Sequence, residues 1–266
     1  MSERNAAASH KRGLVRLLWG MLARPRDTLR HLKEGSSFRW WLPALVAVLM
    51  AVLPVAAGAP LTAEQARDAV LASQERMAEQ QGAELSEEQR AQMESLVASP
   101  LIVVVFPAVA AVVGLLIGWI VWSGSLYLVG MVVGGRSTFG ALFGMVVWTW
   151  LPYTVRGALQ ALFILLSGQL ITQPGLSGLV SAPSSVEEVM AAPPSLGQLA
   201  LSSFLGRIDL FLIWRLVLLV TGVTVVMRLR PRKGLLIIVG LWILLTALGL
   251  IPTLVGGMFS GMVAGT

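Results

Sequence analysis

Residues 23–50 read ARPRDTLRHLKEGSSFRWWLPALVAVLM, and this stretch turns from polar to apolar within a few residues. Its first half is rich in arginine and lysine, and its second half is an apolar run that Trp40 and Trp41 introduce. Aromatic rings favour the boundary between lipid and water, and basic side chains favour lipid headgroups. The stretch therefore predicts a basic surface helix that leads directly into a membrane-spanning helix.

The composition of the whole chain also indicates a membrane protein. Of its 266 residues, 56% are hydrophobic and 13% are charged, whereas soluble domains carry about 25% charged residues. Mean hydropathy is +0.77. The chain has no cysteine, which excludes disulfides and thiolate chemistry. The first long apolar run begins near Trp40, too far from the start for a secretory signal, so we expect the N-terminal segment to be retained without crossing the membrane.

Five apolar segments are long enough to cross a hydrocarbon core of about 30 Å as helices. They cover 40–57, 107–133, 142–166, 205–227 and 235–255. Apolar residues precede the second segment from Leu101 onward, but one helix from there to Val133 would be about 50 Å long. Pro107 therefore predicts the start of the membrane helix proper. The predicted fold is an all-α, polytopic membrane protein with five transmembrane helices.

Basic and acidic loops alternate along the chain. Nine Lys and Arg residues against three acids precede the first span, segment 60–99 has three arginines against eight acids, and segment 168–204 has two glutamates and no basic residue. Arg136 follows the second span, and RLRPRK follows the fourth. Because basic loops stay in the cytoplasm, we predict a cytoplasmic N-terminus and an extracytoplasmic C-terminus. Seventeen arginines against three lysines indicate a GC-rich bacterial genome, hence the bacterial cell (inner) membrane.

Four regions follow from these spans: 1–39, 40–59, 60–99 and 100–266. In 60–99, TAEQ from Thr62 and SEEQ from Ser86 have the capping-box pattern, and Gly82 between them suits a helix C-cap. We predict an extracytoplasmic helical hairpin, with helices over 62–81 and from 86 onward, that either packs on the outer rim or binds an extracytoplasmic partner. The Gly/Pro/Ser-rich segment 168–204 predicts an exposed loop.

The N-terminal region, 1–39, has two amphipathic patterns. Residues 13–22 place leucines at helical spacing, and Pro25 suits the first turn of a second helix in which Leu29 and Leu32 share a face. We expect these basic helices to meet anionic lipid headgroups. Their role as a topology anchor, or as a docking surface for a protein partner, stays open. The predicted docking residues are Arg24, Arg26, Arg30 and Lys33.

The sequence has no pattern for enzyme chemistry. Neither HExxH, nor a paired-carboxylate loop, nor a Walker or Rossmann glycine pattern occurs. We therefore expect no cofactor, no metal and no catalytic residue, and nothing indicates a nucleic-acid partner. Gly134, Gly135 and Arg136 could form an anion nest, but the sequence favours a tight cytoplasmic turn there.

Ionisable residues at membrane depth call for an explanation, since a charge at mid-bilayer costs at least about 2.5–3.5 kcal/mol. Arg156 in the third span and Arg215 in the fourth fall near mid-depth, and Asp209 lies about 9 Å further toward the outside. We predict an intramembrane polar cluster of Arg156, Asp209 and Arg215 between these helices. It would hold the helices together or, alternatively, line a path for a substrate or ion.

Three motifs in this chain resemble bacterial members of the Yip1 family. They are ARPRDTLRHLKEGSSFRWWLPAL before the first span, GGRSTFGALFGMVVWTWLPYTV around the start of the third, and DLFLIWRLVLLVTGV in the fourth followed by the basic turn. The resemblance covers nearly the whole length. It implies an integral membrane protein with a cytoplasmic N-terminus, related to eukaryotic proteins that associate with Rab GTPases in vesicle formation. No catalytic residue carries over.

The sequence thus predicts a non-enzymatic scaffold, adaptor or membrane-organising factor with a protein partner or a second copy of itself. The alternative is a small transporter or permease subunit that uses the polar cluster between the third and fourth helices. An intramembrane enzyme is disfavoured because the chain lacks a set of nucleophile, base and acid.

Overall fold

The structure is a computed structural model, and it describes residues 14–34, 40–81, 86–135, 137–180 and 195–264. These residues contain helices and no strand, as the all-α prediction requires. The helices are α1 (Leu14–Ala23), α2 (Pro25–Glu34), α3 (Trp41–Gln81), α4 (Glu87–Val97), η1 (Leu101–Val105), α5 (Phe106–Val132), α6 (Phe139–Trp148), α7 (Leu151–Ser167), η2 (Ser177–Leu179), α9 (Leu196–Leu205), α10 (Leu210–Val226) and α11 (Pro231–Ala264).

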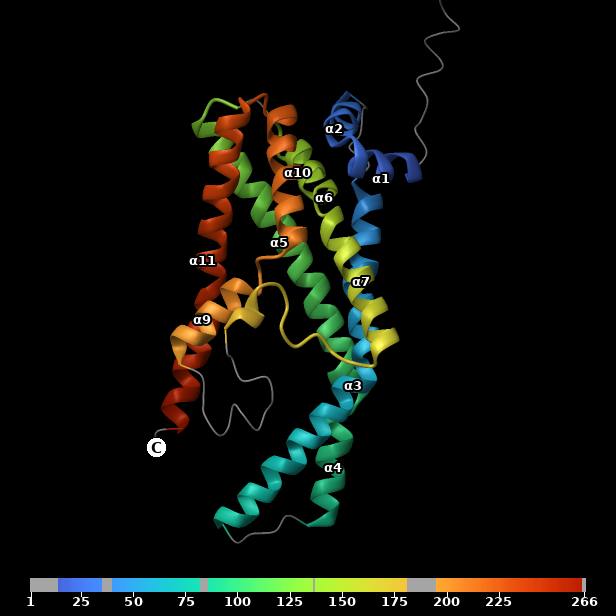
Figure 1. Ribbon diagram of the computed structural model, residues 1–266, viewed down its shortest axis with the longest axis vertical. Helices are drawn as coiled ribbons and strands as arrows, with labels where there is room; N and C mark the ends of the chain where they lie inside the picture. Colours follow the sequence, from blue (N-terminus) through green and yellow to red (C-terminus); the bar gives the residue numbers. More distant parts are fainter. Residues whose placement is uncertain (1–13, 35–39, 82–85, 136, 181–194, 265–266) are drawn as a thin grey trace, which may run out of the picture.

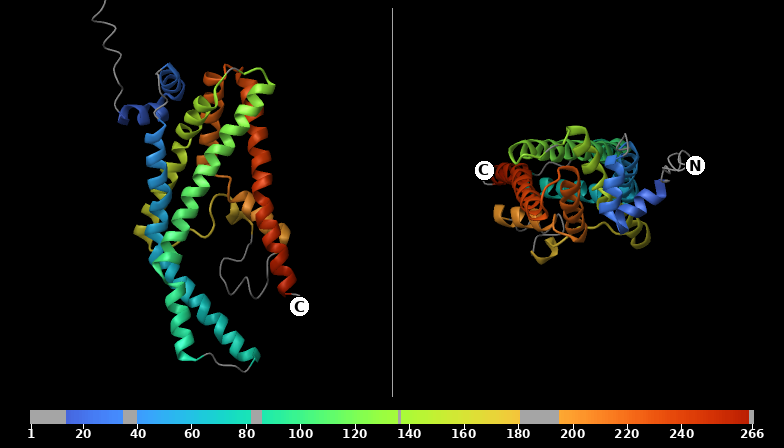
Figure 2. Two further views of the ribbon diagram at one scale, coloured as in Figure 1. Left: turned by 180° about the vertical axis from the view of Figure 1, so that it is seen from behind. Right: turned by 90° about the horizontal axis from the view of Figure 1, so that it is seen from above.

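The helices form an elongated bundle with different features at its two ends (Figure 1). The first half of α3 runs beside α5 and α7, and α10 packs against α6, α7 and α11. At one end α1 and α2 lie crosswise to the bundle, where α2 contacts α10, and the turns after α5 and α10 lie at the same end. At the other end the second half of α3 and α4 extend beyond it, as the reverse view in Figure 2 also shows. We call these the basic end and the α3–α4 arm.

The predicted break between the first span and a separate helix over 62–81 is wrong. α3 continues for 41 residues from Trp41 to Gln81, about 60 Å of helix. Thr62 is an interior residue whose Oγ1 donates to the Gly58 carbonyl at 3.0 Å, so it does not cap a helix start. Pro54 and Pro60 are also interior to α3. Gly82 and the turn that would follow it lie outside the described residues.

α4 begins at Glu87, directly after Ser86, where the second capping-box pattern predicts a helix start. It packs against α3, and Gln74 Nε2 of α3 lies 3.6 Å from Met93 Sδ of α4. The short π-helix η1 then leads into α5, which starts at Phe106 with Pro107 in its first turn. The start of α5 agrees with the predicted start of the second membrane helix.

The third predicted span, 142–166, is two helices and not one. α6 ends at Trp148, the Oγ1 of its C-cap residue Thr149 donates to the Val146 carbonyl at 2.8 Å, and α7 begins at Leu151. Pro152 explains this break, because it lacks a backbone N–H and its ring clashes with the carbonyl four residues earlier in a continuous helix. α6 and α7 have 10 and 17 residues, respectively.

The fourth predicted span starts later than expected. Asp209 caps α10, which begins at Leu210, and α9 is a separate helix bent away from it by 61°. Within the described residues, three helices are long and apolar enough to cross a membrane, or four if this bent pair counts as one span. They cover Trp41–Ala72, Ala91–Val132 and Pro231–Gly256.

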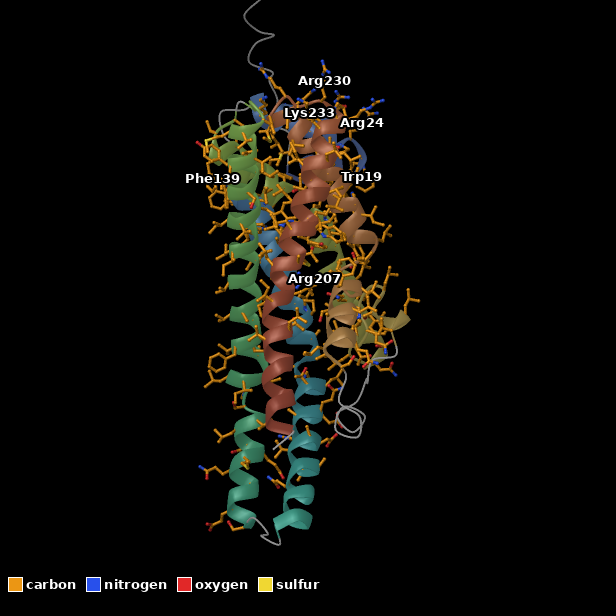
Figure 3. The ribbon with its side chains drawn as sticks, turned by 90° about the vertical axis from the view of Figure 1, so that its left-hand side faces the viewer. Trp19, Arg24, Phe139, Arg207, Arg230 and Lys233 are labelled. Carbon is orange, nitrogen blue, oxygen red and sulfur yellow. The ribbon has the colours of Figure 1, made fainter. Side chains whose placement is uncertain are left out.

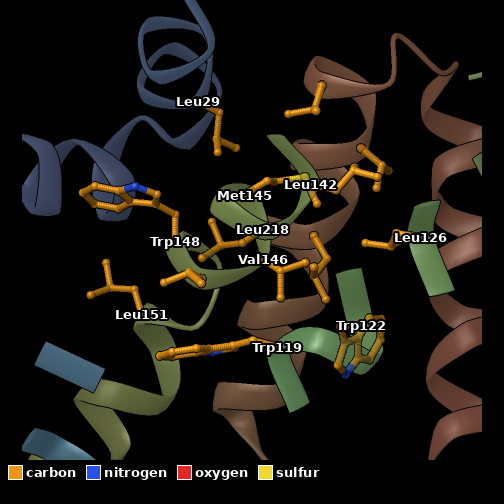
Figure 4. Close-up of a cluster of buried hydrophobic side chains, with 14 of the residues drawn as sticks. Leu29, Trp119, Trp122, Leu126, Leu142, Met145, Val146, Trp148, Leu151 and Leu218 are labelled. Atoms are coloured by element: carbon orange, nitrogen blue, oxygen red, sulfur yellow. The ribbon is translucent and has the colours of Figure 1, made fainter. Parts of the chain in front are cut away.

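The hydrophobic core lies toward the basic end and includes the N-terminal helices. Met21 of α1 and Leu29 of α2 are fully buried, and Figure 4 shows Leu29 pointing toward Met145 of α6. Trp119, Leu126 and Leu218 continue this core into α5 and α10. Because α1 and α2 bury apolar side chains against the bundle, they are packed parts of the fold.

Candidate functional site

An ion pair joins α7 to the start of α10. Arg156 Nη1 lies 2.9 Å from Asp209 Oδ2, with 24% and 13% of the two side chains exposed. The other carboxylate oxygen of Asp209 accepts a hydrogen bond from Leu212 N at 2.7 Å and caps α10. One carboxylate therefore starts a helix and neutralises a cation on the neighbouring helix.

Close contacts bring α7 to this position. A Cβ atom on Gly157 would collide with the Met50 carbonyl of α3, so only glycine lets the two backbones approach this closely. Near Asp209, the loop after α7 packs against the turn between α9 and α10. Leu176 N donates to the Leu205 and Ile208 carbonyls at 3.1 and 3.2 Å. These contacts fix the Asp209 backbone opposite Arg156.

Arg215 does not join this ion pair. It is 3% exposed, and its guanidinium carbon lies over three aromatic rings, 3.9 Å from the ring centroid of Trp150, 4.8 Å from Trp122 and 5.2 Å from Tyr153. Its Nε and Nη2 have no hydrogen-bond partner within the described part of the chain. The negative faces of the rings stabilise the cation where water is absent.

The three rings come from three places in the chain. Trp122 belongs to α5, Trp150 occupies the break between α6 and α7, and Tyr153 lies in the first turn of α7. Both tryptophans near this break face the bundle: Trp148 is fully buried and Trp150 is half-buried beside Arg215. Trp40 and Trp41, in contrast, are 46% and 58% exposed.

A cavity of about 410 Å³ lies between α3 and α7 beside the ion pair. Arg156 is the one charged residue among the described residues that line it. Its other walls include Met50, Pro54, Tyr153 and Gln160. Since Asp209 already holds Arg156, this cavity offers little charge to a polar ligand.

A second cavity, of about 520 Å³, opens at the basic end between α2 and the end of α10. Four cations line it: Arg26, Arg30 and Lys33 of α2, and Arg228 after α10. Lys33 Nζ donates to the Val225 and Val226 carbonyls at 3.0 and 3.3 Å, which ties α2 to the carbonyl end of α10. Arg24, also predicted as a docking residue, is exposed outside this cavity.

Figure 3 shows Arg24, Arg230 and Lys233 gathered at the basic end, with Trp19 nearby. Arg228 was not singled out from the sequence, although its place in the basic turn RLRPRK was a signal.

The predicted GGRS turn does end α5: Gly134 has a φ of 76° and Gly135 N donates to the Gly130 carbonyl at 2.8 Å. Arg136 lies outside the described residues.

The described residues hold no group of three or more His, Cys, Asp or Glu side chains that could bind a metal ion. Long apolar helices and ionisable groups that pair inside the bundle or gather at one end define this molecule as an all-helical membrane protein. A family model described as the Yip1 domain matches residues 19–262, nearly the whole chain. The chain therefore belongs to the Yip1 family, as its motifs indicated, and that family is not known as enzymatic. The comparisons with curated proteins and with solved structures found no match.

Proposed function

We propose that this Yip1-family protein is a non-enzymatic scaffold or adaptor that organises the bacterial cell membrane. Its five spans would be the first half of α3, then α5, the broken pair α6–α7, α10, and α11. The basic end would face the cytoplasm, because basic loops are retained there, and the α3–α4 arm would face outward. A protein partner or a second copy of the chain would dock on the N-terminal helices.

The observation that carries this proposal is the packing of α2 into the bundle. Thr28, Leu29 and Leu32 are at most 4% exposed, so one face of α2 is fixed in the core. Arg26 and Arg30 on the other side of α2, and Arg24 just before the helix, are exposed at defined positions. A docking surface that is already ordered loses little conformational entropy when a partner binds. A merely topological anchor would not need this buried face.

The polar groups inside the bundle support helix contact more than transport. Asp209 neutralises Arg156, and aromatic rings surround Arg215. Both cations therefore have local partners that fit a structural role, because buried charges are normally paired or stacked. A permease subunit would instead require a hydrated path that reaches Arg156, with flux lost in Arg156→Ala while the protein remains folded.

Affinity purification of the intact protein in mild detergent tests the scaffold role. We expect an acidic partner to co-purify with the wild type, and to be lost when Arg24, Arg26 and Arg30 are together replaced by glutamate. Reversing three exposed charges leaves the core face of α2 intact, so α2 should remain packed.

The matched control is Arg67→Glu, which reverses an exposed arginine on the α3–α4 arm and should leave the partner bound. Cross-linking before extraction guards against partners that dissociate in detergent. If the cross-linked protein is recovered as a lone monomer, the scaffold proposal fails.

A further inference from the structure

Among the described residues, the lining of the cavity at the basic end carries positive charge only. No acidic residue is among the described residues that line it. Lys33 is engaged with the α10 carbonyls, whereas Arg26, Arg30 and Arg228 form no ion pair with a described side chain. Three guanidinium groups around one cavity of about 520 Å³ suit an anionic ligand.

The spacing of these cations on α2 is itself unfavourable without an anion. Arg26 and Arg30 are four residues apart and Lys33 is three further on, so all three share one helix face. Like charges at this spacing destabilise a helix slightly. A bound anion would reverse the sign of that contribution.

Arg228 supplies the cation from the opposite wall, and its backbone is strained. Its φ is 57°, the one positive φ at a non-glycine residue in the described chain. It follows the C-cap residue Met227 of α10, a position that usually has glycine because other side chains are strained in this conformation. Such strain persists where the surrounding structure demands it and is frequent in ligand clamps. Here an arginine replaces the expected glycine and lines the cavity.

The position of the cavity relative to the membrane boundary indicates the source of the anion. Trp19 lies at the basic end (Figure 3), where α3 also starts at Trp41 directly after Trp40, and the three side chains are 69%, 58% and 46% exposed, respectively. Exposed tryptophans mark the boundary between hydrocarbon and water. The cavity thus lies at the level of lipid headgroups, and Thr224 with the apolar residues Val225 and Leu229 completes its lining.

We propose that Arg26, Arg30 and Arg228 bind the phosphate of an acidic phospholipid, with Lys33 holding α2 in place. This site does not depend on the scaffold role. Phosphate suits it because guanidinium groups form paired hydrogen bonds with phosphate oxygens. A lipid bound there would join α2 to the α10–α11 turn from the membrane side.

Binding of phosphatidylglycerol to the full chain, purified in neutral detergent at physiological salt, tests this site. Native mass spectrometry counts the bound lipids and gives the dissociation constant. Arg30→Gln and Arg228→Gly should each weaken binding about tenfold, because each removes a charge-assisted hydrogen bond. Arg228→Gly suits the backbone conformation, so this variant should fold at least as well as the wild type.

Arg232→Gln is the matched control, since Arg232 is exposed at the same end but does not line the cavity. It should change binding less than twofold, because no membrane surface potential acts in detergent and salt screens distant charges. An equal loss in all three variants would show diffuse attraction and overturn the site. Equal binding of phosphatidylcholine would also overturn the site. Displacement of the lipid by millimolar inorganic phosphate would overturn it too, because it would indicate a site for soluble phosphate. Lipid binding with no co-purified protein would refute only the scaffold role.

Discussion

Arg156 and Arg215 are both placed inside the bundle, but their guanidinium groups have different surroundings. Arg156 of α7 has one carboxylate at 2.9 Å and remains 24% exposed along a cavity. Arg215 of α10 is 3% exposed and lies against three aromatic rings. One cation is neutralised by an opposite charge, and the other is stabilised by the faces of aromatic rings.

This difference predicts which substitutions destabilise the ion pair and which destabilise the surroundings of Arg215. In the ion pair, removal of either partner leaves the other charge without compensation in a partly buried position. Around Arg215, removal of the cation leaves rings that are stable in an apolar core, but removal of a ring leaves the cation. Stability should therefore be sensitive to both partners of the ion pair, and to the rings more than to Arg215 itself.

Asp209→Ala should have the largest effect. It removes the cap of α10, which costs about 1 kcal/mol, and it leaves Arg156 unpaired. Breaking a buried ion pair costs about 3–5 kcal/mol, and the partial exposure of Arg156 lowers this value. We expect the free energy of unfolding to fall by about 3 kcal/mol in total. Unfolding of the purified protein in mild detergent, followed by tryptophan fluorescence, measures it.

Asp209→Asn separates the two contributions, because asparagine caps helices well but carries no charge. This variant should lose about 2 kcal/mol, and adding Arg156→Met should restore most of that loss. An Asp209→Asn protein as stable as the wild type would mean that packing alone holds α7 to α10.

Trp150→Leu should have the next largest effect, about 2 kcal/mol, because it removes the ring nearest to a desolvated cation. Trp150→Phe keeps a ring and should lose about half as much. Trp150 also makes edge contacts with Trp119 and Tyr153, so part of the loss is packing. The same substitution in an Arg215→Met background isolates the cation contribution, and a coupling energy of zero there would contradict the aromatic stabilisation of Arg215.

Residue counting placed Arg156 near mid-depth and Asp209 about 9 Å further toward the outside, a separation that a long arginine side chain can partly span. The two residues carry opposite charges on helices that were expected to be antiparallel neighbours, and the structure brings them together. The same counting put Arg215 near them. It could not identify the Arg215 neighbours, since α5 and α10 are apolar all round and such helices carry little pattern to show which side faces inward.

Some local sequence patterns predicted the wrong helix boundaries, because the tertiary structure overrides them. The TAEQ pattern at Thr62 reads as a helix start, yet α3 passes through it. Pro152 was a signal for the break between α6 and α7, but segment 142–166 taken as a whole is apolar enough to be interpreted as one span. Trp150 occupies that break, so its inward position depends on a helix break that composition alone does not reveal.

Arg215→Met should have a smaller effect than either change above. It removes the desolvation cost of a buried cation together with its attraction to the rings, and methionine fills a similar volume. Such replacements are often close to neutral, so we expect a change within about 1 kcal/mol in either direction. Arg215→Gln is the control, because it places an uncharged polar group in the same apolar surroundings and should cost about 1–3 kcal/mol. A large loss in the methionine variant alone would show that the rings depend on the cation.

Arg207→Ala should have the smallest effect, although Arg207 is only two residues from Asp209. Arg207 is exposed, and its Nη2 donates to the Gly249 carbonyl of α11 at 2.9 Å. An exposed cation on a backbone carbonyl gains little over its hydration in water, so we expect a loss of less than about 0.5 kcal/mol in the same unfolding measurement. A loss above about 1.5 kcal/mol would mean that Arg207 fastens α11 to the start of α10. The bundle would then hold Arg207 as it holds Lys33, through a backbone carbonyl in the place of a carboxylate or a ring.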